Sequence, residues 1–120
     1  MGEEHFLTRK IPFSLIFAKG KTWTSKEIVL RALPNRLSSS RFGFVVSRRV
    51  GKAVVRNRVK RRLREIIRQT PVRHGWDIIL IARIPAAAAG FMDLNQSVRK
   101  LLVRAGLLAG ENEGFSPGTN

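Results

Sequence analysis

The amino-acid sequence predicts an α+β fold, an α/β sandwich in which helices pack on a small mixed sheet of about four strands. Three observations lead to this prediction. The expected elements follow one another as helix, two or three strands, helix, strand and helix, without an internal repeat. Apolar residues recur at helical spacing in two segments and alternate with period two in another. The length of 120 residues suits one domain with a modest core.

The first third of the chain predicts a helix and then strands. The helix is expected over residues 9–18, with Thr8 as a candidate N-cap, Pro12 in the first turn and Gly20 as the stop. Residues 21–33 have strand composition and are expected to form two pieces that break near Ser25 and Lys26. The polar sequence PNRLSSSR then predicts a turn or an exposed loop.

The middle of the chain predicts a strand, a long helix and a second strand. In residues 41–47, Phe42, Phe44 and Val46 alternate, as in a strand with one buried face. Gly51 is expected to open a helix that continues to about residue 69 and that Pro71 and Gly75 end. The apolar run WDIILIAR predicts an interior strand. We expect four aromatic residues in the core: Trp23, Phe42, Phe44 and Trp76.

The last third predicts an amphipathic helix. The stretch IPAAAAG is a connector or a piece of helix that Pro85 breaks. Residues 93–105 carry apolar side chains at helical spacing: Leu94, Val98, Leu101, Leu102 and Ala105. We expect residues 1–110 to form a single α/β domain and residues 111–120 to be a disordered tail.

The charge balance predicts an anionic partner. Lys and Arg total 23 against 8 Asp and Glu, which gives a formal net charge of +15 and a pI near 11.9. Such self-repulsion costs stability unless a polyanion neutralises it. A membrane partner is not expected, because the run IPAAAAGFM is far shorter than the ~20 apolar residues of a span and MGEEHF lacks a signal-peptide layout. Without cysteine there is no disulfide partner, which fits a cytoplasmic protein.

The basic stretch in residues 54–65 predicts a binding surface. On a helical wheel an apolar stripe spans a sector of roughly 120°, formed by Val55, Val59, Leu63, Ile66 and Ile67. Polar and cationic residues occupy the opposite side and the flanks: Arg56, Asn57, Arg58, Lys60, Arg61, Arg62, Arg64 and Arg68. A merely solvated helix face would need mixed charges for i,i+4 pairs, and Glu65 stands almost alone here.

Residues just before this helix extend the basic surface. Arg48, Arg49 and Lys52 add charge, and Gly51 allows a tight turn whose following N–H groups can bind phosphate, although it is equally compatible with a simple turn. The excess of arginine favours phosphate and base contacts. Asn57 either caps locally or uses its amide to bond RNA or orient an arginine, and both interpretations stay open.

The segment SRRVGKAVVRNRVKRRLRE, with Arg-Asn-Arg followed by Lys-Arg, closely resembles the signature of the bacterial ribonuclease P protein subunit. The stretches LTRKIPFSLIFAKGKTW, RFGFVVS and WDIILIAR resemble the first helix and strands of that family. The resemblance covers the chain up to about Gly110.

This resemblance implies a protein that binds the catalytic RNA of ribonuclease P and the 5′ leader of precursor tRNA, and assists RNA-catalysed endonucleolytic removal of the leader. It implies a ribosomal-protein-S5-domain-2-like fold with a left-handed βαβ crossover, whereas the general rule predicts a right-handed one. No cofactor is expected on the protein itself, and Mg²⁺ is expected through the RNA subunit.

The resemblance also implies two sets of site residues. The expected RNA-subunit-binding residues are Arg48, Arg49, Lys52, Arg56, Asn57, Arg58, Lys60, Arg61, Arg64 and Arg68. A leader-binding cleft between the sheet and the first helix is expected to contain Phe13, Phe17 and Arg31. Without the resemblance, the i,i+4 spacing of the two phenylalanines predicts inward packing. With it, they form a stacking platform worth ~1–3 kcal/mol per base.

Two positions depart from the family pattern. Pro12 stands where a polar helix residue is usual, so the helix is expected to start late or tilt. Arg31 stands where relatives can carry an aromatic residue. If the Arg31 side chain faces the cleft, its guanidinium would stack on the leader in place of an aromatic ring, and the leader preference could differ.

The titratable residues predict no catalytic and no metal-binding residue in this chain. The eight acids are scattered or lie in the tail, and His5 and His74 have no partner at ligand spacing. The main alternative function is a non-catalytic RNA-binding assembly protein such as a ribosomal component. A DNA-binding regulator would need a helix-turn-helix where strands are predicted.

Overall fold

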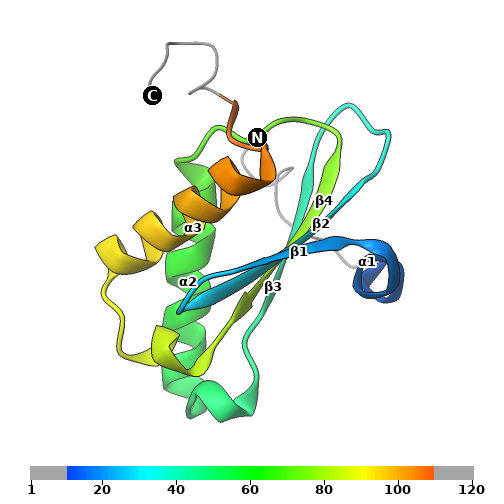
Figure 1. Cartoon of the computed structure of the whole chain (residues 1–120). Coiled ribbons are helices and arrows are strands. Elements are labelled where there is room, and N and C mark those ends of the chain that lie inside the picture. Colours follow the sequence, from blue (N-terminus) through cyan, green and yellow to red (C-terminus); the bar gives the residue numbers. More distant parts are fainter. Residues whose placement is uncertain (1–10, 110–120) are drawn as a thin grey trace.

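The protein's structure is a computed structural model in which residues 11–109 are described. Helices α2 (Ala53–Arg68) and α3 (Phe91–Ala105) cover one face of a four-stranded sheet, and the short helix α1 (Phe13–Lys19) lies on the other face (Figure 1). This arrangement confirms the predicted α+β fold with a small mixed sheet. None of the helices in residues 11–109 is long and apolar enough to cross a bilayer.

The sheet has the strand order β1-β2-β4-β3. Strand β1 (Lys21–Thr24) pairs antiparallel with β2 (Ile28–Pro34), and β2 pairs antiparallel with β4 (Trp76–Ala82). Strand β3 (Arg41–Val45) lies parallel to β4 at the edge. The interior position of β4 is the predicted one, and its apolar run follows from burial on both faces of the sheet.

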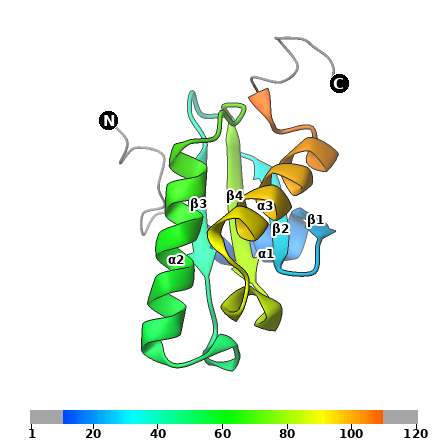
Figure 2. The same ribbon diagram turned by 90° about the vertical axis from the view of Figure 1, so that its left-hand side faces the viewer.

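Helix α2 connects the two parallel strands by a left-handed crossover. In Figure 2, α2 and α3 lie on the viewer's side of the sheet, β3 and β4 run downward, and β4 lies to the right of β3. The general preference for right-handed crossovers would have predicted the opposite hand. The hand implied by the family resemblance is therefore the correct one.

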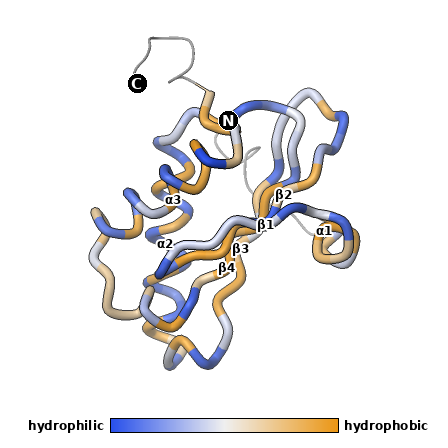
Figure 3. Tube along the Cα trace, in the orientation of Figure 1, coloured by the Kyte–Doolittle hydropathy of each residue, from blue (hydrophilic) through white to orange (hydrophobic). Residues whose placement is uncertain are grey.

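Two hydrophobic cores hold the layers together. The larger one joins the sheet to α2 and α3 and includes Leu30, Phe42 and Leu63. The smaller one joins the opposite face to α1 through Ile16 and Ile79. Figure 3 shows the strands mostly in hydrophobic colours, while the tubes of α2 and α3 alternate between hydrophobic and hydrophilic residues. The other predicted core aromatics, Trp23, Phe44 and Trp76, are partly buried against the larger core.

The first helix begins later than the range 9–18 indicates, and this late start is the one that the departure at Pro12 predicts. It starts at Phe13, because Pro12 has the non-helical ψ of 78° and a proline disfavours helical geometry at the residue before it. Gly20 ends the helix as predicted. Thr8, the candidate N-cap, and residues 9–10 lie outside the described residues.

Further along, the predicted boundaries are nearly those observed. The strand region breaks between Thr24 and Ile28, and the long helix ends one residue before its expected end. Helix α3 begins at Phe91, two residues earlier than predicted, and a 3-10 turn, η3 (Ile84–Ala87), occupies the alanine-rich stretch before it. The tail expected to be disordered lies outside the described residues, and the assignment of residues 1–110 to one domain stays a prediction.

Candidate nucleic-acid interface

Helix α2 is anchored by one face and presents cations on the others. Val59, Leu63, Ile66 and Ile67 are buried against the sheet, so the helix axis is fixed along β3 and β4. The expected RNA-subunit-binding residues all lie on this helix or immediately before it. Seven of them are exposed: Arg48, Arg49, Lys52, Asn57, Arg61, Arg64 and Arg68. The other three, Arg56, Arg58 and Lys60, are half-buried.

The turn before α2 brings its cations close to the helix start. Arg48 and Arg49 belong to a short 3-10 turn, η2 (Arg48–Val50). A Cβ on Gly51 would lie 2.9 Å from the Cβ of Val55, so only glycine permits this close approach. Lys52 is the N-cap residue and makes no side-chain capping bond, and no acid lies in the first turn. The partial positive charge of the helix N-terminus therefore adds to the charge of these side chains.

Protein carboxylates neutralise little of this charge. Within residues 11–109, ion pairs join Arg41 to Asp77 at 2.7 Å and Arg68 to Glu65 at 2.9 Å. Arg68 is thus the one expected RNA-binding residue with a carboxylate partner in this part of the chain. An exposed pair of this kind contributes about 1 kcal/mol or less. Among the described residues, carboxylates of the protein therefore leave most of the positive charge of α2 unneutralised.

Some arginines of α2 also hold the protein together. Arg58 Nη2 donates to the carbonyl of Ala87 at 3.2 Å, and Arg62 Nη1 donates to the carbonyl of Ala89 at 2.9 Å. Arg64 lies with its Cζ 5.9 Å from the centroid of the Phe44 ring. Sequence analysis missed these roles, because the acceptor carbonyls lie 27 to 29 residues away in the chain.

A second candidate surface lies on the opposite face of the sheet, around α1. Phe13 packs against β3, where a Cβ on Gly43 would lie 2.8 Å from the Phe13 Cζ atom. Phe17 is 44% exposed. The guanidinium of Arg31 lies 5.5 Å from the centroid of the Phe17 ring. The three residues expected at a leader cleft thus come from α1 and β2 to one side of the sheet, away from α2 (Figure 1).

The two phenylalanines differ in environment. Phe13 is half-buried and packs on the smaller core, as the i,i+4 spacing predicts for an inward ring. Phe17 is exposed over nearly half of its surface and does not follow that prediction. Phe17 therefore offers the free ring surface that a stacking role requires.

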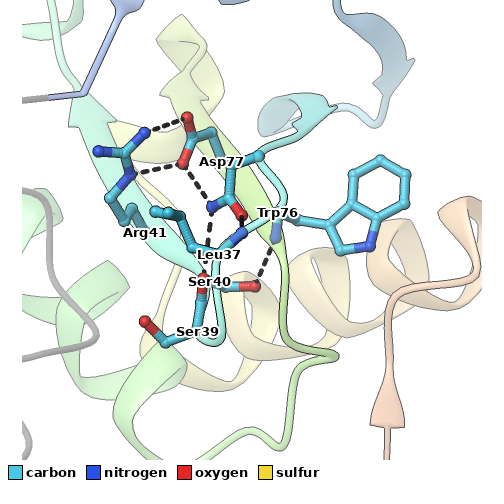
Figure 4. A network of polar contacts seen from close by, with 7 residues as sticks. Leu37, Ser39, Ser40, Arg41, Trp76 and Asp77 are labelled. Atoms are coloured by element: carbon cyan, nitrogen blue, oxygen red, sulfur yellow. Dashed lines mark hydrogen bonds and ion pairs between the residues drawn. The ribbon is translucent and has the colours of Figure 1, made fainter.

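A buried polar network fixes the edge of the sheet near this second surface. Asp77 accepts two hydrogen bonds from Arg41, each 2.7 Å long, and one from Asn35 at 2.9 Å (Figure 4). The side-chain oxygen of Asn35 accepts from the backbone N–H of Leu37. The bonds from Arg41 to Asp77 raise the pKa of the Arg41 guanidinium. This network ties the loop after β2 to β3 and β4, and sequence reasoning did not identify it.

The described acids do not gather at one place. Within residues 11–109 no group of three or more His, Asp or Glu side chains could hold a metal ion. Glu27 and Asp93 lie near the start of β2 and of α3, Glu65 on α2 and Asp77 on β4. The absence of catalytic and metal-binding residues from the whole chain stays a prediction.

Comparison with known proteins gives one consistent family. A family model described as Ribonuclease P matches residues 1–106. The ribonuclease P protein component of Dehalococcoides mccartyi is 43% identical over 116 residues, which is 97% of each chain. That of Roseiflexus castenholzii is 47% identical over 94 residues, 76% of this chain and 77% of the relative.

Solved structures give the same result. The RNase P protein from Thermotoga maritima is 34% identical and superposes with a TM-score of 0.73, over 82% of this chain and 94% of that one. The RNase P protein of Staphylococcus aureus is 28% identical, with a TM-score of 0.77 over 87% and 97% of the two chains.

Proposed function

The chain belongs to the ribonuclease P protein family, and from that premise we propose how its two surfaces act within the ribonucleoprotein. It is the protein subunit of ribonuclease P, the endoribonuclease ribonucleoprotein involved in tRNA 5′ maturation, and its partner is the ribonuclease P RNA. This family membership favours ribonuclease P over the ribosomal alternative.

The α2 surface binds the RNA subunit. The observation that carries this proposal is the row of exposed cations on a helix whose other face is fixed in the core, with one carboxylate partner among the described residues. The planar guanidinium group of arginine can form two hydrogen bonds to phosphate oxygens, and the packed helix holds these groups at constant spacing. Contact is made by Arg48, Arg49, Lys52, Arg56, Asn57, Arg58, Lys60, Arg61, Arg64 and Arg68.

The α1 surface binds the 5′ leader of precursor tRNA. Phe17 presents its exposed ring to an unpaired base, and Phe13 supports the surface from the sheet side. Stacking on an aromatic ring tolerates any base, which suits leaders of varied sequence. Because α1 and α2 lie on opposite faces of the sheet, the protein can hold the RNA subunit and the leader at the same time.

The cleavage chemistry belongs to the RNA subunit, in the cytoplasm. Mg²⁺ is bound through RNA phosphates, and the protein acts by positioning the leader and by screening phosphate repulsion. Screening by the α2 cations lowers the Mg²⁺ concentration that the RNA needs to fold and bind substrate.

Reconstitution with a bacterial ribonuclease P RNA tests this function. At low Mg²⁺ the protein and RNA together should remove the 5′ leader from a precursor tRNA, whereas the RNA alone should do so only slowly. The protein alone should leave the precursor intact. Absence of stimulation at low Mg²⁺ would refute the proposed role, and leader removal by pure protein would refute catalysis by the RNA.

A further inference from the structure

Arg31 of β2 lies with its guanidinium at the C-terminal end of α1. Its Nη2 donates to the carbonyls of Phe17 at 2.5 Å, Ile16 at 3.2 Å and Gly20 at 3.3 Å. Its Nη1 donates to Thr22 Oγ1 at 2.5 Å. One side chain thus joins the last turn of α1 to strands β1 and β2.

Helix α1 is short and has few other polar attachments. It is seven residues long, its N-cap residue Pro12 makes no side-chain capping bond, and Ile16 is its one buried residue. The last carbonyls of a helix lack partners within the helix and carry partial negative charge. The Arg31 guanidinium donates to the carbonyls of Ile16 and Phe17 in the last turn and to that of the C-cap residue Gly20. Its positive charge interacts favourably with the negative end of the helix dipole. Arg31 therefore adds a polar attachment at the end of α1 to the apolar contacts of Ile16 and Phe13 that hold the helix on the sheet.

The end of α1 packs closely against β2 at Gly20. A Cβ on Gly20 would lie 2.6 Å from the carbonyl oxygen of Ile16 and 3.0 Å from that of Ala32. The end of α1 is thus pressed against β2 beside Arg31. The Arg31 side chain is half-buried, and its Nε is buried. Nη2 is thus directed at the end of α1 and Nη1 at Thr22 of β1, while the buried Nε has no hydrogen-bond partner among the described residues.

The same guanidinium supports the Phe17 ring. Its Cζ lies 5.5 Å from the ring centroid, within the range of a cation–π contact. With one ring face against a fixed cation and 44% of the residue exposed, Phe17 is held in place while its other surface stays open.

We propose that Arg31 is a positioning residue for the leader: it fixes the end of α1 and the ring of Phe17, and does not itself bind a leader phosphate. This inference rests on the proposed leader-binding role of the α1 surface. Positioning needs the fork geometry of arginine, whereas a phosphate contact needs only a positive charge.

The test compares variants in the particle assembled with a bacterial ribonuclease P RNA. The measured quantity is the ratio of its affinity for a precursor tRNA to its affinity for the mature tRNA, followed over a range of salt concentrations. Arg31→Lys keeps the positive charge and loses the planar guanidinium, and Arg31→Ala removes both. Thr22→Val keeps Arg31 and removes one acceptor. Lys19→Ala removes a neighbouring exposed cation as the control, and Phe17→Ala tests the leader surface itself.

Arg31→Lys should lower the affinity ratio about fivefold or more, the lower end of what one stacked base contributes. Thr22→Val should lower it less, in the same direction, and Lys19→Ala should leave it unchanged. Because no phosphate contact is lost, the salt slope of the ratio should stay the same with Arg31→Ala. The affinity of each variant for the RNA subunit should match that of the unmodified protein, which excludes general unfolding.

Two results would overturn the inference while leaving the proposed function intact. One is a normal ratio for Arg31→Lys together with a loss of about 0.7 in the salt slope for Arg31→Ala, the signature of a direct single-strand phosphate contact. The other is a normal ratio for both Arg31 variants when Phe17→Ala lowers it. A normal ratio for Phe17→Ala would instead refute the leader-binding role of the α1 surface.

Discussion

Arg41 and Arg73 both flank the loops beside β4, but only Arg41 has a buried carboxylate beside it. Replacing Arg41 by Ala leaves Asp77 buried, with Asn35 as its remaining side-chain donor. The free energy of unfolding should fall by roughly 3 kcal/mol, the lower end of the range for breaking a buried pair, because Arg41 is itself one quarter exposed.

The measurement is urea unfolding of the free protein, with Arg73→Ala as the control. Arg73 is exposed, so its replacement should change the free energy of unfolding by less than about 0.5 kcal/mol. Equal losses in the free energy of unfolding for the two substitutions would show that Arg41 does not stabilise the buried carboxylate of Asp77.

Gly43 determines where the Phe13 ring can lie. A methyl group at position 43 would stand 2.8 Å from the end of that ring, which must then move. Gly43→Ala should therefore lower discrimination between precursor and mature tRNA several-fold, within the range of one stacked base, and leave RNA-subunit affinity unchanged. Gly90→Ala is the matched control, because nothing lies within 4 Å of a Cβ at that position. If Gly43→Ala left the discrimination between precursor and mature tRNA unchanged, Phe13 would have no role in leader binding.

Substitutions of two neighbouring arginines of α2 should have different effects, one on protein stability and the other on RNA binding. Arg62 donates to the carbonyl of Ala89 and holds the start of α3, whereas Arg61 points away from the core and is exposed. Arg62→Ala should lower the free energy of unfolding by about 1 kcal/mol with little loss of RNA affinity. Arg61→Ala should weaken RNA binding and leave stability unchanged.

Urea unfolding and RNA-subunit titration of both variants check this separation. If Arg61→Ala destabilised the protein as much as Arg62→Ala, the division between structural and RNA-binding arginines on α2 would be wrong.

The elements could be predicted where local chemistry decides them. Apolar residues at helical spacing fix α2, a continuous apolar run fixes β4, and Gly20 ends α1. The range 9–18 placed the start of α1 too early, whereas the departure at Pro12 predicted a late start, because a proline restricts the backbone of the residue before it.

The candidate sites divide in the same way. The cations of α2 are visible in the sequence because they recur on one helix. The roles of Arg31, Arg58 and Arg62 are not, because their partners are backbone carbonyls that only the tertiary fold brings near. The network around Asp77 likewise joins residues up to 42 positions apart.

At the scale of the whole molecule, the sheet separates two RNA-binding tasks. One face carries α2 and α3 and the other carries α1 (Figure 1). The hand of the crossover decides on which face of the sheet α2 lies, and local sequence patterns do not report it. The left-handed crossover was predicted only from the resemblance to a family.

The salt dependence of RNA-subunit binding tests most directly whether α2 is an electrostatic anchor. If α2 and the turn before it neutralise about six phosphates, the logarithm of the association constant should fall with the logarithm of salt concentration at a slope of roughly −4 to −5. A nearly flat slope would contradict the account, because the affinity would then come from contacts other than the cations of α2.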